Sequence, residues 1–136
     1  MFTEEQKEAT FQKCKKIEGL NPNIWRIDAS GAIIRKTSYG RDDELYGWEI
    51  DHVVPLALLR KYNVPETLWD DDVNLRALNW NNNVSKDDSY PTYSIVVTSN
   101  DDGISNTFTI GNRTVNCELQ DRLRSLYGNY IDFDNL

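Results

Sequence analysis

Apolar positions in this chain change their spacing several times, and each change predicts a different element. Thr3 followed by Gln6 has the signature of a capping box, so a helix is expected over residues 3–17, with Gly19 as its end. The short apolar runs at 25–27 and 32–34 predict two strands. Between them lies a turn, in which Gly31 suits a positive φ.

The middle of the chain combines apolar runs with turn residues. Residues 48–54 form a run typical of a buried strand, which ends at Pro55. A short helix over 56–62 and a second strand over 75–78 follow. Asn79 is suited to cap a helix that reaches about residue 87, before Pro91 stops it.

The last third alternates apolar and polar residues, which predicts half-buried strands at 93–98 and 107–110 with a turn at 100–103. Gly111-Asn112 predicts a second turn, and Asn116 is suited to cap a final helix. We therefore expect one α+β domain over residues 1–136. Its parts are an N-terminal helix and hairpin (3–40), a core (46–90), and a C-terminal β-hairpin plus helix (93–128).

Composition narrows the classes of function. The net charge of −7 comes largely from acidic clusters in predicted loops, which disfavours tight binding of nucleic acid. No apolar run reaches the roughly 18 residues that a membrane span needs. The first residues lack a secretory signal pattern, and Cys14 and Cys117 form no CxxC pair, which excludes a zinc ribbon. We expect a cytoplasmic protein with two buried free thiols.

His52 is the only histidine, and it directly follows Asp51 at the end of a predicted strand. An imidazole, a carboxylate and an amide can together activate water and hold one divalent metal ion, as phosphodiester hydrolysis requires. On the helix after Asn79, Asn83 and Lys86 share one face. Consecutive strand residues point to opposite sides, so Asp51 and His52 reach one phosphate only if the strand distorts there.

The order strand–loop–strand–helix carries three spaced motifs: Asp51-His52-x-x-Pro55, Asn74-Leu75-x-x-Leu78 and Asn83-x-x-Lys86. This arrangement resembles the HNH nucleases of the ββα-metal class, in particular the small stand-alone proteins of bacteria or phages. The resemblance covers roughly residues 24–91. It implies a ββα-metal core flanked by the N-terminal and C-terminal parts described above.

The resemblance also implies roles for particular residues. His52 is expected to act as general base, and Asn74 to support the catalytic loop. Asp51 and Asn83 are expected to bind one divalent metal ion, with Mg²⁺ or Mn²⁺ favoured. Asn82 and Asp87 are the alternative ligands on the helix. The expected phosphate contacts, each of which could instead be an ordinary surface charge, are Lys86, Arg41 and Arg76.

Two features depart from the family pattern. An asparagine, Asn83, takes the last ligand position instead of a histidine. The loop between His52 and Asn74 is longer than in close stand-alone relatives and includes an acidic triplet at 70–72. Within that loop Trp69 is a candidate base-stacking residue, whereas the other three tryptophans are expected in the core.

We therefore expect a metal-dependent HNH endonuclease that hydrolyses phosphodiester bonds of DNA, with DNA favoured over RNA and nicking as the default. A homodimer or an inhibitor protein are further partners to consider. Two alternatives stay open. One is a catalytically silent HNH-fold interaction module whose acidic surface binds a basic partner, and the other is a toxin or effector nuclease.

Overall fold

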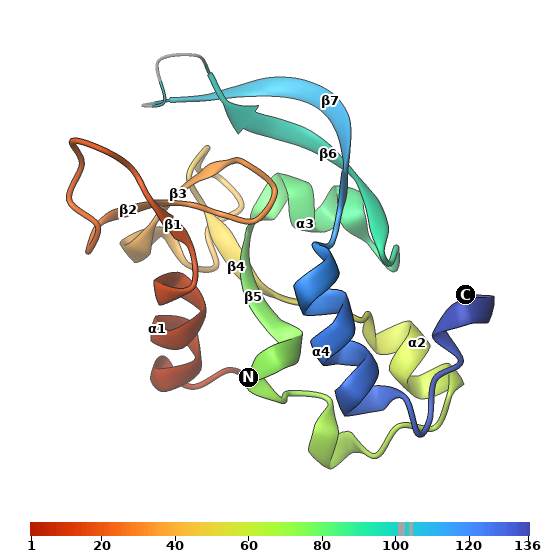
Figure 1. The fold of residues 1–136 in the computed structure, drawn as a ribbon. Coiled ribbons are helices and arrows are strands. Elements are labelled where there is room, and N and C mark those ends of the chain that lie inside the picture. The colour runs from red at the N-terminus through yellow and green to blue at the C-terminus, as the bar shows by residue number, and fades with distance from the viewer. Residues whose placement is uncertain (101–102, 104) are drawn as a thin grey trace.

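The structure, a computed structural model, describes residues 1–136 except 101, 102 and 104, and its fold is α+β (Figure 1). In the described residues the strands form three small antiparallel sheets, β1-β2-β3, β4-β5 and β6-β7. The strands are β1 Lys15–Lys16, β2 Trp25–Ile27, β3 Ile33–Arg35, β4 Trp48–His52, β5 Leu75–Asn79, β6 Thr92–Ser99 and β7 Asn106–Thr114. The α-helices are α1 Glu4–Gln12, α2 Leu56–Lys61, α3 Trp80–Lys86 and α4 Cys117–Tyr127. Short 3-10 helices are η1 Lys36–Ser38, η2 Glu66–Leu68, η3 Asp72–Asn74 and η4 Phe133–Asn135.

The capping box of α1 is present, since Thr3 and Gln6 exchange side-chain and backbone hydrogen bonds. The helix, however, ends at Gln12, so the expected extension to residue 17 is wrong. Buried Arg26 gives the reason, because its Nη1 donates to the backbone oxygens of Gln12 and Cys14. A guanidinium from β2 thereby satisfies carbonyls at the helix end, and the chain turns into β1.

The predicted turn between β2 and β3 is confirmed, with Gly31 at φ +92°. Its anchor is the buried carboxylate of Asp28, which accepts hydrogen bonds from the Ser30 backbone and hydroxyl and from the Ala32 backbone. The other oxygen accepts one from the Asn79 N–H at 2.6 Å. Burial raises the pKa of Asp28, and these hydrogen bonds oppose that effect. This carboxylate therefore ties the β2–β3 turn to the end of β5.

The central pair, β4 and β5, is antiparallel with Asp51 opposite Arg76, and α3 follows β5 without a loop. Asn79 caps α3 as predicted, because its side chain accepts a hydrogen bond from the Asn81 N–H. α1 packs on one face of the pair, where the Phe11 ring lies 5.7 Å from the ring of Trp48. Figure 1 shows α1 and α4 on either side of β5.

The C-terminal ribbon, β6 with β7, differs from the expectation. β7 runs through residues 111 and 112, so no turn exists there, because pairing continues past a register shift between Ile95 and Val97. At the expected turn of 100–103, the Gly103 N–H donates to the Asn100 oxygen, while residues 101 and 102 lie outside the described residues. The predicted final helix is confirmed as α4, with the Asn116 side chain capping it at Leu119 N–H.

The larger hydrophobic cluster joins the segment after β4 to the C-terminal third, so this third completes the core. Its buried members are Val53, Val54, Leu59, Val64, Tyr93, Ile95, Val115, Leu123, Tyr127 and Ile131. The loop tryptophan Trp69 packs against this cluster and donates Nε1–H to the Val64 oxygen, so it is not an exposed stacking platform. Both cysteines are free, but the expectation that both are buried is wrong, since Cys14 is half-buried and Cys117 is exposed.

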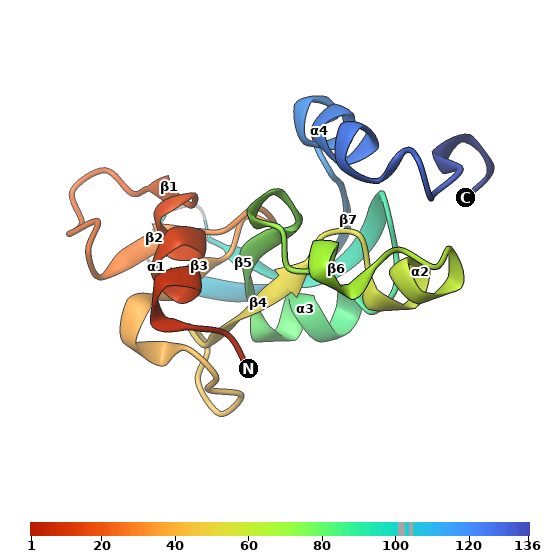
Figure 2. The same cartoon turned by 90° about the horizontal axis from the view of Figure 1, so that it is seen from below.

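No helix in the described part of the chain is long and apolar enough to cross a bilayer. Figure 2, which views the molecule from below, shows α1 and α4 separated across β5 and α2 near the C-terminus.

Asn82 fastens α3 to the ribbon and is fully buried. Its Oδ1 accepts hydrogen bonds from the backbone N–H groups of Val96 and Val97 at the register shift. Its Nδ2 donates to the Val97 oxygen and to the Ser30 hydroxyl. The Asn82 side chain therefore joins α3 to β6 and to the β2–β3 turn, which accounts for its burial.

We predict that Asn82→Ala lowers the free energy of unfolding by about 3 kcal/mol, because it leaves buried backbone groups without partners. Asn81→Ala is the matched control, since the Asn81 side chain forms no hydrogen bond to any described residue. It should cost about 0.5 kcal/mol or less. Urea unfolding of both variants measures the difference, and equal losses would contradict the role assigned to Asn82.

Candidate functional site

β4 stays regular to its last residue, which determines where the two central candidates point. Asp51 pairs with Arg76 and His52 pairs with Leu75, with no irregularity at this end of the strand. Side chains of consecutive strand residues therefore leave opposite faces of the β4–β5 pair. Asp51 faces α3 and His52 faces the side of α1, so the strand distortion that would bring them to one phosphate is not found.

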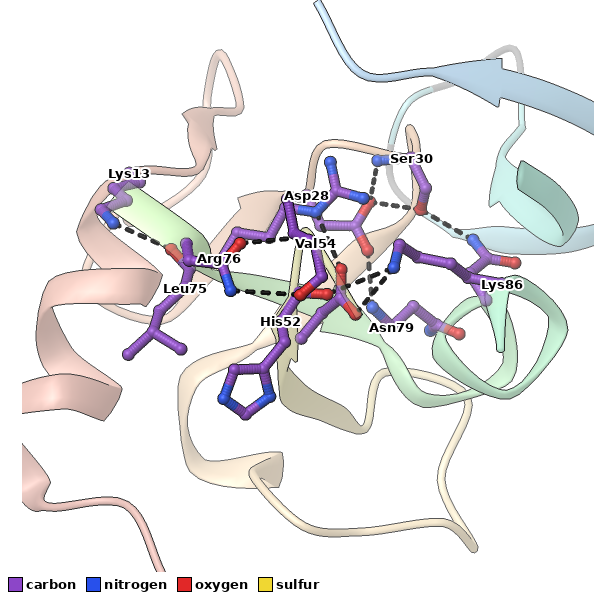
Figure 3. A network of polar contacts seen from close by, with 12 residues as sticks. Lys13, Asp28, Ser30, His52, Val54, Leu75, Arg76, Asn79 and Lys86 are labelled. Atoms are coloured by element: carbon purple, nitrogen blue, oxygen red, sulfur yellow. Dashed lines mark hydrogen bonds and ion pairs between the residues drawn. The ribbon is translucent and has the colours of Figure 1, made fainter. Parts of the chain in front are cut away.

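His52 lies at the end of β4 against residues that come from two distant segments. Its Nε2 is 2.6 Å from Oδ1 of Asp70, and its ring centroid lies 5.6 Å from that of Phe2. The side chain is 16% exposed, whereas that of Asp70 is 55% exposed. Figure 3 shows the imidazole pointing away from Lys86. An imidazole held at one nitrogen keeps the other available for proton transfer.

Asn74, at the end of η3, fixes the segment that follows His52. Its Oδ1 accepts a hydrogen bond from the Val54 N–H at 2.7 Å, and its Nδ2 donates to the Val54 oxygen and to the Trp69 oxygen. The side chain is fully buried. Asn74 therefore joins the end of β4 to the residue just before Asp70, and so holds both partners of the His52–Asp70 contact.

On the opposite face, Asp51 forms a buried cluster with two cations. Its Oδ2 is 3.1 Å from Nε of Arg76, and its Oδ1 is 3.3 Å from Nζ of Lys86. All three residues are at least nine-tenths buried. Lys86 also donates to the backbone oxygen of His52, as Figure 3 shows. Burial lowers the pKa of Lys86, and the charge of Asp51 opposes that effect.

The remaining predicted residues lie apart from this cluster. Asn83 does not contact Asp51; its Nδ2 donates to Oε2 of Glu49 at 3.0 Å. Arg41 is exposed and forms a bidentate pair with Asp43, at 2.9 and 2.8 Å. The structure thus brings Asp51, Lys86 and Arg76 together, but Asn83 and Arg41 have other partners. Lys86 is neither a solvated lysine nor accessible to a phosphate in this arrangement.

The predicted metal ligands Asp51 and Asn83 do not lie around a common point. Both oxygens of Asp51 face cations, and Asn83 presents its amide nitrogen to Glu49. A divalent ion between Asp51 and Asn83 would have to displace Lys86, so the residues as arranged do not form an oxygen-lined metal site. No group of three or more His, Cys, Asp or Glu side chains gathers into a metal site among the residues that the structure describes.

Two contacts are not predictable from the motifs. Asp70 belongs to the acidic triplet 70–72, yet it contacts His52 from 18 positions away. Glu49, two residues before Asp51, shares its face and meets Asn83. The period of two in a strand could have found Glu49 once α3 was placed over that face. No local signal indicates Asp70, because its position depends on the course of the loop.

Comparison of the chain with models of protein families, with curated proteins and with solved structures found no match.

The buried cluster predicts unequal effects of removing its members. Asp51→Asn leaves two buried cations without an anion and should lower the free energy of unfolding by about 3–5 kcal/mol. Lys86→Met keeps the Asp51–Arg76 pair and a side chain of similar length, so we expect a clearly smaller loss. Chemical denaturation of both variants gives the order. An equal loss, or a larger one for Lys86→Met, would show that Asp51 is not the charge on which the cluster depends.

Proposed function

We propose that this protein is an endonuclease of the HNH kind that hydrolyses phosphodiester bonds of nucleic acid, with His52 as general base. The observation that carries the proposal is the placement of His52. It ends the first strand of a β4–β5–α3 unit, contacts Asp70 and is followed by a segment that Asn74 holds. The spacing of the three motifs, which resembles HNH nucleases, supplies the substrate class. DNA remains favoured over RNA, and nicking is the default.

The chemistry assigned to His52 follows from its hydrogen bond. When Nε2 carries the proton that is donated to Asp70, Nδ1 keeps a lone pair that can take a proton from water. The resulting hydroxide attacks the phosphorus atom, the bond from phosphorus to the 3′-oxygen breaks, and that oxygen takes a proton from solvent, which gives 5′-phosphate and 3′-hydroxyl ends. Asp70 stabilises the positive imidazolium that forms and keeps the ring in one orientation, as a carboxylate behind a catalytic histidine does. Asp70 is a positioning residue, because it acts through His52.

The divalent metal ion that the HNH resemblance implies would be held by Asp51 and Asn83, but these two side chains do not converge. Mg²⁺ or Mn²⁺ would supply charge stabilisation at the phosphate if it bound. Lys86, Arg76 and Arg41 likewise stay predictions as phosphate contacts. Only a rearrangement of their ion pairs would expose Lys86 to substrate.

A second candidate is a catalytically silent module that binds a basic partner. Every cation predicted to hold phosphate is paired with an acid: Arg41 with Asp43, and both Arg76 and Lys86 with Asp51. The exposed carboxylates at 42 and 87–88, together with the net charge of −7, favour a cationic partner. The two candidates differ in whether any nucleic acid is cut.

The test is cleavage of supercoiled plasmid, single-stranded DNA and RNA, each with Mg²⁺, with Mn²⁺ and with a chelator. We expect the wild type to cut and His52→Ala to be slower by at least about 100-fold, because general base catalysis supplies that much. With no second histidine in the chain, no other imidazole can substitute. Activity in the chelator also shows whether the predicted metal is needed.

Asp70→Asn tests the positioning role, and Asp72→Asn is its matched control. Asp72 belongs to the same triplet, but its carboxylate contacts Lys13 instead of His52. We expect a loss of about tenfold for Asp70→Asn and less than twofold for Asp72→Asn. A wild type that cuts none of the substrates, or a His52→Ala variant as active as the wild type, overturns the proposal. If the wild type cuts none of the substrates, the catalytically silent module remains as the candidate function.

A further inference from the structure

The imidazole of His52 is contacted by a residue from outside the strand–loop–strand–helix motifs. Phe2, which precedes α1, places its ring centroid 5.6 Å from that of His52, with the two ring planes tilted by 43°. Phe2 lies outside the residues 24–91 that resemble HNH nucleases. The N-terminal segment therefore contributes a side chain to the surroundings of the proposed base.

Phe2 is itself anchored on a small hydrophobic cluster. The buried members of this cluster are Phe11, Ile34, Trp48, Ile50, Leu75 and Ala77. Trp48, Ile50 and His52 alternate along β4 and so share one face of the strand pair. His52 is the polar end of this apolar face, and Phe2 packs on the cluster and on the imidazole at the same time.

The start of α1 fixes the direction in which the chain reaches Phe2. Thr3 is the N-cap of the helix: its N–H donates to Oε1 of Gln6 at 2.8 Å, and its hydroxyl accepts from the Gln6 N–H at 3.1 Å. Packing of an apolar residue directly before an N-cap sets the angle at which the chain enters the helix. In this protein that residue is Phe2, and it packs on His52 and the cluster.

The contact with Asp70 does not by itself fix the orientation of the imidazole. The Asp70 side chain is 55% exposed, so water competes for its hydrogen bond with Nε2 of His52. That bond holds one ring atom, whereas the torsion about the Cβ–Cγ bond of a histidine has broad preferences. A second side chain against the ring is needed to restrict this rotation, and Phe2 is in place to do so.

We propose that Phe2 is a second positioning residue for His52, which holds the imidazole in the orientation that Asp70 selects and shields their hydrogen bond from water. Phe2 has no group that transfers a proton, so it acts only through the imidazole. Its catalytic consequence rests on the proposed function, because it concerns the same base. The restriction of the ring does not depend on hydrolysis and is measured separately.

Carbon relaxation of protein labelled at histidine measures the order of the ring, and the single histidine gives one set of signals. We expect the order parameter of the ring Cδ2–H bond to fall from about 0.85 in the wild type to below about 0.6 in Phe2→Ala. Phe2→Leu keeps an apolar side chain on the cluster without a ring and should lie between them. If Phe2→Ala does not fold, the comparison of Phe2→Leu with the wild type decides.

Tyr39→Ala is the matched control. Tyr39 also packs against the cluster, but its ring lies on Trp48, with 4.9 Å between the centroids. This substitution removes an aromatic ring from the same cluster and leaves the contact of Phe2 with His52 in place. We therefore expect the order parameter of the His52 ring to stay at the wild-type value.

Steady-state cleavage provides the second measurement. We expect Phe2→Ala to lower kcat about tenfold with KM unchanged, and Tyr39→Ala to change kcat less than twofold, because only the former misplaces the base. A ring as ordered in Phe2→Ala as in the wild type, or equally disordered in Tyr39→Ala, overturns the proposal. So does a loss of ring order that leaves kcat intact, or a rise in KM alone. If the wild type cuts nothing, the proposed hydrolysis fails while the ring order still decides the role of Phe2.

Discussion

The hydrogen bonds of the Asn74 side chain are the constraint on which the candidate site depends. With one amide, Asn74 holds both polar groups of the Val54 backbone and the carbonyl of Trp69. The hydrogen bonds to Val54 fix the direction of the chain where it leaves β4 after His52. The hydrogen bond to Trp69 fixes the loop next to Asp70. Because the amide is fully buried, each of these bonds lacks competition from water. The His52–Asp70 contact is a consequence of this tie.

The neighbouring residues Asp51 and His52 lie on opposite faces of β4 and have different surroundings. Asp51 is directed to α3, where Lys86 and Arg76 neutralise it and where its role is to hold the helix on the strand pair. His52 is directed to the loop, where its ring is partly exposed and has a carboxylate partner. The regular pairing of β4 separates the buried charge of Asp51 from the imidazole that we propose as the base.

Local signals in the sequence were sufficient for most helices and strands, but not for the contacts between distant segments. The caps at Asn79 and Asn116 were predictable because a cap depends on residues two or three positions away. The early end of α1 was not, because Arg26 reaches it from β2. Motif spacing singles out His52 and Asn74 as candidates, and their roles stay predictions; it does not indicate Asp70, because a long loop without periodicity decides where that residue lies. Burial of Lys86 likewise depends on how α3 crosses β4, which spacing along one helix does not contain.

The central claim is that the loop holds Asp70 against Nε2 of His52 and leaves Nδ1 as the base. Nitrogen NMR of the imidazole tests it most directly, because the chain has a single histidine and therefore gives one pair of ring signals. For the neutral ring we predict a proton on Nε2 and none on Nδ1, with this preference lost in Asp70→Asn. A proton on Nδ1, or rapid exchange between the two tautomers in the wild type, would contradict the account.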